Sequence, residues 1–156
     1  MITIDIPGFK MICCEHLVLD YNGTLAIDGK IKDGVKQALN LLAANVKVHV
    51  ITADTFGKAK DELKDIKCEF VILNGKNHDR KKANYANNLV NENVIAIGNG
   101  RNDVLMLKNA AIGIAVVQKE GAASEALKNS DVICTDIMDA LNLLINPKRL
   151  VATLRN

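Results

Sequence analysis

The sequence predicts an α/β protein with a doubly wound, mainly parallel sheet in a three-layer α/β/α arrangement. Short apolar runs alternate with helical segments along most of the 156-residue chain, and this alternation implies right-handed βαβ crossovers. Hydrophobic residues make up 49% of the chain but aromatic residues only 3%. The core must therefore consist of Ile, Val, Leu and Ala, which suits buried parallel strands. Several apolar runs end in a polar residue, as at the ligand-binding edge of such a sheet.

The first segments predict two small antiparallel features beside this sheet. Residues 2–6 alternate apolar and polar, Pro7-Gly8 favours a turn, and 10–14 predict a second strand. We therefore expect an N-terminal hairpin over residues 1–14, on the edge of the main sheet. The first core strand follows at 16–20, and Asp28-Gly29 predicts a two-residue turn in a small flap.

The remaining elements alternate in the order expected of βαβ units. Strands are expected at 46–51, 69–73, 93–97, 111–116 and 131–134. Helices are expected near 33–44, 55–64, 78–90, 102–109, 119–128, 136–145 and 147–154. The first of these helices has its apolar residues at helical spacing: Val35, Ala38, Leu39 and Leu42. The chain is expected to be one domain over 1–156, with a core at 16–145 and a C-terminal helix and tail at 147–156.

Composition narrows the classes of partner. The net charge of +2, with 24% charged residues, gives no electrostatic case for a nucleic-acid or membrane partner. No signal peptide and no apolar run of about 20 residues is present, so we expect a soluble, cytoplasmic protein. The four cysteines lack Cys-x-x-Cys spacing and are expected to be reduced, mostly buried thiols. The three histidines (His16, His49 and His78) are scattered and suggest no zinc site.

Reactive side chains are expected to meet at one edge of the sheet. Asp20 ends the first core strand, and Thr52 ends the second. Lys81 and Lys82 begin a later helix, and Asp103 lies in the loop after another strand. Each residue alone has an ordinary interpretation, as a turn residue, a helix cap or a solvated lysine. Because the strand-end loops of a doubly wound sheet converge on one crevice, their order together favours catalysis.

This set of groups suits a phosphoryl group. Asp20 would attack phosphorus in line and form an aspartyl-phosphate. Mg²⁺ would bridge Asp20, Asp103 and a phosphate oxygen. The Thr52 hydroxyl and the Ala53 backbone amide would hold phosphoryl oxygens, and Lys82 would neutralise their charge.

The turn after Asp20 completes the phosphate-binding set. Gly23 permits a tight turn with close backbone approach, and Thr24 adds a hydroxyl.

These motifs, over residues 16 to about 145, resemble the haloacid dehalogenase superfamily of phosphohydrolases. The resemblance assigns Asp20–Thr24 to motif one, Thr52 to motif two, Lys82 or Lys81 to motif three, and Gly98–Asp103 to motif four. The run from Ile97 to Val116 is similar to the phosphorylation domain of P-type ATPases, and the group resembled most is their small soluble relatives.

The interval between Asp20 and Thr52 is too short for an inserted nucleotide-binding or cap domain. Capless members act on exposed phosphates of large substrates or oligomerise so that a neighbour closes the site, and the flap and the 1–14 hairpin are candidate closing surfaces.

Two positions depart from the family pattern. Asn22 replaces the aspartate that acts as general acid and base, and asparagine cannot transfer a proton in this role. We therefore expect slow turnover or a long-lived aspartyl-phosphate. The Asn22 main-chain carbonyl remains able to bind Mg²⁺, as the family's residue at this position does. Asn99 also replaces an aspartate, and its neutral amide oxygen is a weaker Mg²⁺ ligand, which lowers the expected metal affinity.

The site residues suggest three possible functions for this fold. The leading hypothesis is a Mg²⁺-dependent phosphatase acting on a small-molecule or macromolecular phosphate, with a homo-oligomer left open. The alternative, which Asn22 and Asn99 favour, is a catalytically weak phosphate-binding or regulatory module of the same fold. A phospho-acceptor receiver domain fits poorly, because the region of Asp5 and Glu15 does not supply an acidic pair at a strand end.

Overall fold

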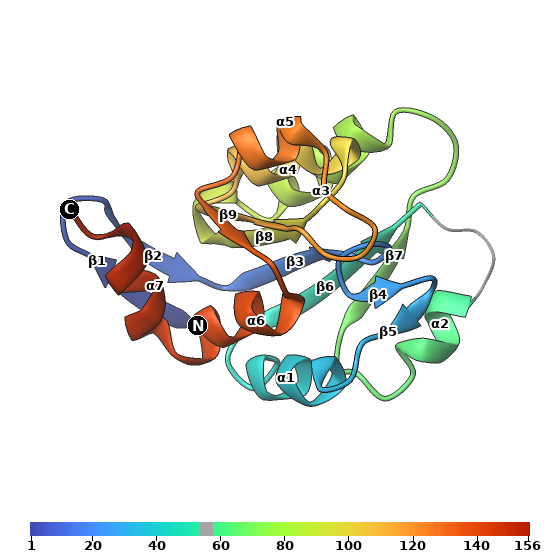
Figure 1. Ribbon diagram of the computed structural model, residues 1–156, viewed down its shortest axis with the longest axis horizontal. Helices are drawn as coiled ribbons and strands as arrows, with labels where there is room; N and C mark the ends of the chain where they lie inside the picture. The colour runs from blue at the N-terminus through green and yellow to red at the C-terminus, as the bar shows by residue number, and fades with distance from the viewer. Residues whose placement is uncertain (54–57) are drawn as a thin grey trace.

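The computed structural model describes residues 1–53 and 58–156 and has the predicted α/β fold (Figure 1). Six parallel strands form the main sheet in the order β10-β9-β8-β3-β6-β7. The central strand β3 (His16–Asp20) lies between β8 (Val94–Gly98) and β6 (Lys47–Thr52). The outer strands are β7 (Glu69–Ile72), β9 (Ile112–Val116) and β10 (Val132–Cys134). The strand that ends in Asp20 therefore lies near the middle of the sheet, with a parallel neighbour on each side.

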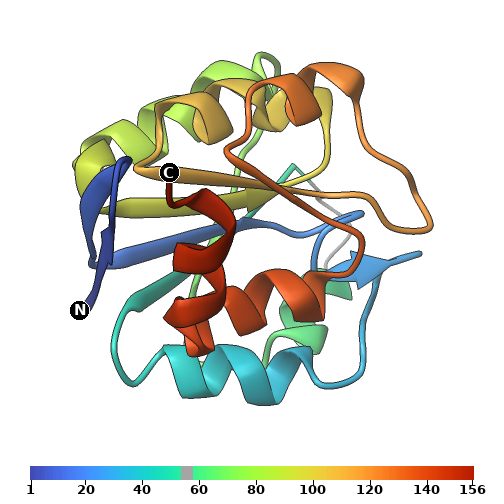
Figure 2. The same ribbon diagram turned by 60° about the vertical axis from the view of Figure 1, so that its left-hand side comes forward.

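Helices cover both faces of this sheet, as Figures 1 and 2 show. One layer holds α1 (Val35–Leu42), α2 (Lys58–Glu62) and α6 (Ile137–Ile145). The other holds α3 (His78–Asn88), α4 (Val104–Asn109) and α5 (Ser124–Lys128). Two 3-10 turns, η1 (Asn91–Asn93) and η2 (Arg101–Asp103), flank β8. The last helix, α7 (Pro147–Leu154), packs against the N-terminal hairpin.

Alternation along the strands divides the core between the two layers. Leu17 and Leu19 of β3 belong to the cluster under α1 and α6, whereas Val18 belongs to the cluster under α3 and α4. The predicted apolar face of α1 is buried as expected: Val35, Ala38, Leu39 and Leu42. Since side chains alternate along a strand, Asp20 shares the Val18 side and faces the layer that contains α3.

The N-terminal hairpin forms, but not on the edge of the main sheet as expected. β1 (Ile2–Ile6) and β2 (Lys10–Cys14) make a separate two-stranded antiparallel sheet. Glu15 explains this arrangement: its N–H donates to the Asn93 carbonyl and its carbonyl accepts from the Lys47 N–H. The chain therefore passes directly from β2 into β3, and the hairpin extends from the amino ends of the strands. A surface at that end cannot cover Asp20 of the same chain.

The flap lies at the opposite, carboxyl end of β3 (Figure 1). β4 (Ala26–Ile27) pairs with β5 (Lys30–Ile31), and Asp28 and Gly29 have φ angles of 52° and 78°. This is the predicted two-residue turn with both central residues in the left-handed region. The Tyr21 hydroxyl donates to the Gly29 carbonyl at 2.9 Å and fixes the flap to the end of β3. Within the described ranges, the flap is the only substructure between β3 and α1, so no cap domain is inserted there.

Two expected helices differ from the observed ones. The helix expected at 119–128 begins only at Ser124, because the Gly121 N–H donates to the Gln118 carbonyl at 2.8 Å and closes a turn. Gly121 has a φ of +74°, a conformation that favours glycine. Of the helix expected at 55–64, residues 54–57 lie outside the described residues, and α2 covers 58–62.

Two further expectations concern the thiols and the membrane. Only Cys14 is buried, whereas Cys13, Cys68 and Cys134 are partly exposed, and all four are free thiols. Across the described residues, no helix has the length and apolar character needed to cross a membrane.

Candidate active site

The candidate active site lies where three neighbouring strands end. Asp20 is the last residue of β3 and Thr52 the last residue of β6, and Asn99 directly follows β8. Because these strands are parallel and adjacent, their carboxyl ends bring the three side chains to the same edge. All three are buried, so they lie inside the edge of the sheet and not on a solvated rim.

Lys82 joins the two carboxylates of the site. Its ammonium lies 2.5 Å from Asp20 Oδ1 and 2.7 Å from Asp103 Oδ1. Lys82 and Asp103 are 0% exposed. Lys81 instead donates to the Asn74 carbonyl, so of the two lysines that the sequence left open, it is Lys82 that faces Asp20. Helical spacing accounts for this choice, since Lys82, Ala83 and Ala86 form the buried face of α3.

Backbone amides orient Asp103. Its Oδ2 accepts from the Asn99 N–H at 3.0 Å and from the Gly100 N–H at 2.8 Å, which leaves Oδ1 for Lys82. Gly98 allows the loop to close in this way, because a Cβ there would lie 2.5 Å from the Asp103 carboxyl carbon. The carboxylate is therefore held in place before any ligand binds.

The turn after Asp20 meets the Asn99 side chain. The Thr24 hydroxyl is 3.3 Å from both Asp20 Oδ2 and Asn99 Oδ1. Gly23 has a φ of +79°, and a Cβ there would lie 2.4 Å from Asn99 Nδ2. Position 23 thus requires glycine both for its backbone conformation and for the close approach of Asn99.

The amide of Asn99 has a fixed orientation. Its Nδ2 donates to the Gly121 carbonyl at 3.0 Å, which directs Oδ1 toward Thr24 and Asp20. A carboxylate at position 99 would place an oxygen against that carbonyl oxygen. The Asn99 nitrogen therefore holds the loop at Gly121, and the Asn99 oxygen faces the candidate site.

The electrostatics of the site follow from two carboxylates and one ammonium in a buried setting. Burial, with the Asp103 charge, raises the pKa of Asp20 above its usual range, although Lys82 opposes the rise. Burial disfavours the charged Lys82 ammonium, but the Asp20 and Asp103 charges outweigh it and raise the pKa of Lys82. With all three groups ionised the cluster carries a formal charge of −1, which favours entry of a cation.

The oxygen donors of the site fit Mg²⁺. Two carboxylates (Asp20 and Asp103) and the Asn99 amide oxygen supply hard oxygen ligands, the kind that Mg²⁺ prefers. No cluster of three His, Cys, Asp or Glu side chains suited to a metal occurs in the described ranges 1–53 and 58–156. The fit therefore depends on the amide of Asn99 as well as on the acids.

The other predicted site residues lie around this cluster. Thr52 is 1% exposed and its carbonyl accepts from the Leu73 N–H, and Ala53 follows it with partial exposure. Asn22 is exposed and makes a β-bridge with Ala26 in the turn. The structure thus places Asn22 at the solvent side of the turn and Thr52 inside the edge of the sheet.

Comparison with known proteins gives a family match for part of the chain. A family model for haloacid dehalogenase-like hydrolases matches residues 76–139, which include Lys82, Asn99 and Asp103. An uncharacterized protein of Methanocaldococcus jannaschii, MJ0073, is 54% identical over 66 residues, which cover 42% of this chain and 71% of that protein. Residues 76–139 of this chain therefore match the haloacid dehalogenase-like hydrolases.

Several solved structures share the fold at low identity. The 3-deoxy-D-manno-octulosonate 8-phosphate phosphatase of Moraxella catarrhalis, solved with magnesium, phosphate and KDO, aligns with a TM-score of 0.67 at 18% identity, over 91% of this chain and 94% of that one. The cobalt-bound deoxy-D-mannose-octulosonate 8-phosphate phosphatase of Haemophilus influenzae aligns with a TM-score of 0.72 at 12% identity, over 92% and 94%. These similarities establish the family's Rossmann-like fold for nearly the whole chain.

The structure also shows a polar cluster that the sequence did not predict. His16 Nδ1 and His49 Nε2 are 2.9 Å apart, and His49 Nδ1 is 2.9 Å from the Tyr85 hydroxyl. Glu69 Oε2 lies 3.4 Å from His49 Nδ1. Tyr85 is one helical turn after Lys82 on α3, and His49 is three residues before Thr52 on β6. The cluster therefore connects the two elements that carry these candidate site residues.

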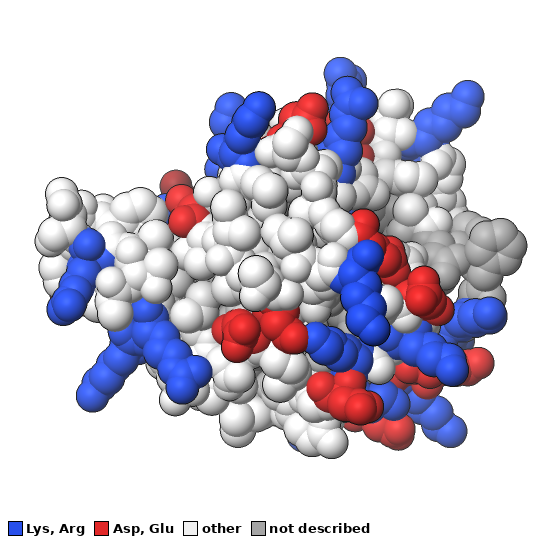
Figure 3. All heavy atoms as spheres, in the orientation of Figure 1, with Lys and Arg blue, Asp and Glu red and all other residues white. Residues whose placement is uncertain are grey.

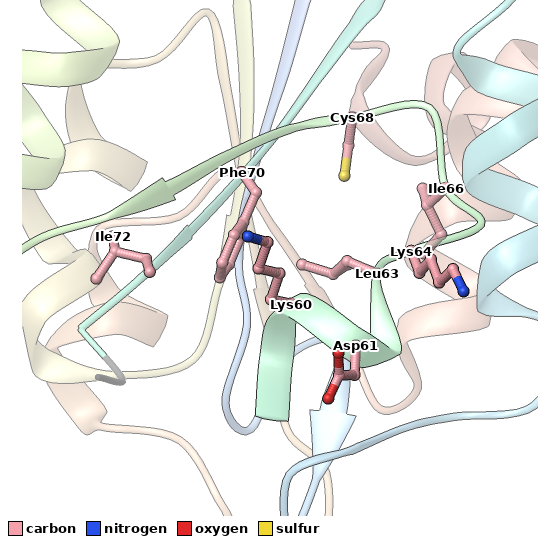
Figure 4. Close-up of a pocket in the computed structure, with 8 residues that line it drawn as sticks. All are labelled: Lys60, Asp61, Leu63, Lys64, Ile66, Cys68, Phe70 and Ile72. Atoms are coloured by element: carbon pink, nitrogen blue, oxygen red, sulfur yellow. The ribbon is translucent and has the colours of Figure 1, made fainter. Parts of the chain in front are cut away.

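Other surface features lie outside the candidate site. A cavity of about 660 Å³ lies between α2 and β7 and is lined mainly by apolar side chains (Figure 4). Leu63 extends toward Phe70 in this cavity, and none of the predicted site residues lines it. On the face in Figure 3, basic and acidic side chains are mixed around β4, β5 and α2 without a large patch of one sign.

Replacing Lys82 with Met should destabilise the protein strongly. The substitution leaves two buried carboxylates without their cation, which typically costs about 3–5 kcal/mol. Protonation relieves this repulsion, so the deficit relative to wild type should shrink as the pH falls. Urea unfolding at two pH values measures both effects. Lys81→Met, at a surface position, should stay within about 0.5 kcal/mol of wild type; an equal loss in the two variants would contradict the assignment.

The histidine pair should make folding sensitive to acid. Burial lowers the pKa of both His16 and His49 below their usual value. Below about pH 6.5 the unfolded chain therefore binds more protons at these sites than the folded chain, and stability falls. We expect His49→Gln to lose less thermal stability than wild type between pH 7.5 and pH 5.5. His78→Gln, outside the cluster, is the control and should behave like wild type; an identical pH response of His49→Gln would refute the linkage.

Proposed function

We propose that this chain is a Mg²⁺-dependent phosphatase that forms an aspartyl-phosphate on Asp20. The observation that carries the proposal is the buried Asp20–Lys82–Asp103 arrangement at the carboxyl end of the central strand. It provides a nucleophilic carboxylate (Asp20) and a second carboxylate (Asp103), both in direct contact with the Lys82 ammonium. Phosphoryl transfer depends mainly on such positioning and charge stabilisation.

The reaction would proceed in two displacements at phosphorus. An Asp20 oxygen bonds to phosphorus as the bond from phosphorus to the leaving oxygen breaks, and the leaving group takes its proton from water. Water then attacks the phosphorus of the aspartyl-phosphate, which releases inorganic phosphate and restores the Asp20 carboxylate. Lys82 supplies fixed positive charge beside the attacking oxygen in both steps.

The metal and phosphate ligands follow from the sequence and the donor set. Asp20, Asp103, the Asn99 amide oxygen and the Asn22 main-chain carbonyl would hold Mg²⁺. When bound, Mg²⁺ would offset the negative charge shared by the carboxylates and the phosphoryl oxygens. The phosphoryl oxygens would be held by the turn at Gly23-Thr24, the Thr52 hydroxyl, the Ala53 N–H and Lys82. The Thr24 hydroxyl, between Asp20 and Asn99, supports this assignment.

The two asparagines would set the rate and the metal affinity. Asn22 cannot give a proton to the leaving group or take one from water, so both displacements would be slow and the phosphoenzyme long-lived. Asn99 contributes a neutral oxygen, so Mg²⁺ would bind less tightly than to an aspartate at that position. The similarity of residues 97–116 to the phosphorylation domain of P-type ATPases, whose phosphoenzyme persists, agrees with this behaviour.

The substrate would be a phosphate monoester that can reach a site without a cap. The structural relatives named for 3-deoxy-D-manno-octulosonate 8-phosphate support a small phosphorylated metabolite with a polar body. A larger substrate with an exposed phosphate, or a homo-oligomer in which a neighbour closes the site, is equally compatible with the open edge. We place this activity in the cytoplasm and propose no nucleic-acid or membrane partner.

Substitution of the nucleophile tests the proposal directly. Wild type should release phosphate from p-nitrophenyl phosphate only when Mg²⁺ is present, and Asp20→Asn should lower the rate by at least about 10³-fold. Asp5→Asn, exposed on the hairpin, is the matched control and should retain wild-type activity. Acid quenching after incubation with labelled acetyl phosphate should trap label on wild type and not on Asp20→Asn. Equal rates in these two proteins would contradict the nucleophilic role.

Restoring the missing carboxylate tests the role of position 22. Asn22→Asp should raise kcat by about 10²–10⁴-fold, because general acid–base catalysis typically contributes that much, and should shorten the lifetime of the trapped phosphoenzyme. A bell-shaped pH profile should appear only in this variant. If wild type binds phosphate and Mg²⁺ but turns over negligibly until Asn22→Asp is made, the second candidate function, a phosphate-binding or regulatory module, is favoured. An unchanged kcat would refute the role given to position 22.

A further inference from the structure

The segment between β9 and α5, residues 117–123, contacts both the Gly23-Thr24 turn and Asn99. Gln118 Nε2 donates to the Gly23 carbonyl at 3.1 Å and to the Thr24 carbonyl at 2.8 Å. The Gly121 carbonyl accepts from Asn99 Nδ2 at 3.0 Å, and the Ala123 N–H donates to the Asn99 carbonyl at 2.8 Å. One short segment therefore holds both the turn after Asp20 and the loop after β8.

These contacts close a ring of hydrogen bonds beside the nucleophile. The Thr24 hydroxyl links Asp20 to Asn99, and the Asn99 amide links to Gly121. The Gly121 N–H donates to the Gln118 carbonyl, and the Gln118 side chain returns to Thr24. A displacement of any one member would move the Thr24 hydroxyl or the Asn99 oxygen relative to the Asp20 carboxylate.

The side-chain amide of Gln118, like that of Asn99, has a fixed orientation. Its Nε2 serves two carbonyl oxygens, and its Oε1 accepts from the Ile137 N–H at 2.9 Å. Ile137 is the first residue of α6, so the amide is held from the helix as well as from the turn. Rotation of the amide would bring oxygen against two carbonyls and nitrogen against an N–H, and leaving buried polar groups unpaired is costly.

We propose that Gln118 is a positioning residue for the reaction, which sets the geometry of Thr24 and Asn99 around Asp20 from outside the site. This inference rests on the proposed function. Gln118 touches none of the groups assigned to attack, charge stabilisation or proton transfer, and acts through the backbone of the Gly23-Thr24 turn. Side chains that orient a metal ligand from behind typically change affinity or activity by about 10–100-fold when removed.

Two substitutions separate the contacts of the amide. Gln118→Glu keeps an oxygen that can accept from the Ile137 N–H. It replaces the Nε2 donor with a carboxylate oxygen, so the hydrogen bonds to the Gly23 and Thr24 carbonyls are lost. Gln118→Met keeps the length of the side chain and removes both contacts. Lys119→Met, next to it and exposed, is the control. If the contact with the turn is the functional one, both position-118 variants lose activity; if only the contact with α6 matters, Gln118→Met alone does.

The readouts are kcat and KM for p-nitrophenyl phosphate, Mg²⁺ affinity by calorimetry, and the thermal midpoint. We expect both variants to lower kcat by about 10–100-fold and to weaken Mg²⁺ binding, with KM within about threefold of wild type and Lys119→Met unchanged. A purely structural residue would lower the midpoint and leave kcat per folded molecule at the wild-type value, which would overturn the proposal. If Gln118→Met fails to fold, Gln118→Glu decides.

The same measurements distinguish failure of this inference from failure of the proposed function. If wild type shows no Mg²⁺-dependent hydrolysis, the proposed function is refuted, and the Mg²⁺ affinity of Gln118→Glu then tests the positioning role. Weaker binding than wild type supports it, and equal binding overturns it. Absence of Mg²⁺ binding to wild type would contradict both proposals.

Discussion

The contact on which the candidate site depends is the buried Lys82 ammonium between the carboxylates of Asp20 and Asp103. Two carboxylates this close, shielded from water, are stable only when a cation compensates them. The three residues come from the central strand, from helix α3 and from the turn after β8, so the ion cluster fixes how these elements pack. In turn, the doubly wound order of strands is what brings α3 over the end of β3. The same three charged residues therefore form the candidate site and hold β3, α3 and the turn after β8 together.

The site has a charged half and a neutral half. The Lys82 ammonium contacts Asp20 Oδ1 and Asp103, whereas the Thr24 hydroxyl lies beside Asp20 Oδ2 and the Asn99 amide oxygen, and Gln118 holds the Thr24 carbonyl. An aspartate at position 99 would add a negative charge beside a cluster whose formal charge is −1 when Asp20, Lys82 and Asp103 are ionised. The neutral Asn99 amide avoids that charge and donates to the Gly121 carbonyl.

Much of this architecture was accessible from the sequence because it depends on local patterns. Apolar runs and helical spacing predicted the strands and the buried face of α1, and the polar residues at strand ends predicted that Asp20, Thr52, Lys82 and Asp103 converge. What the sequence did not predict depends on contacts between distant residues. Gln118 lies more than 90 positions from the turn that it holds, and His16 meets His49 only because their strands are adjacent. The alternating pattern of the hairpin predicts a position on the sheet edge, because it does not show that Glu15 leads directly from β2 into β3.

The orientation of the Asn99 amide has an evolutionary consequence. Its nitrogen is engaged by the Gly121 carbonyl, in a turn that depends on the left-handed conformation of Gly121. A relative with aspartate at position 99 would need a hydrogen-bond donor in place of the Gly121 carbonyl. Positions 99, 118 and 121 are linked by one set of hydrogen bonds, so a chimera whose junction lies between β8 and α5 would separate partners that contact each other here.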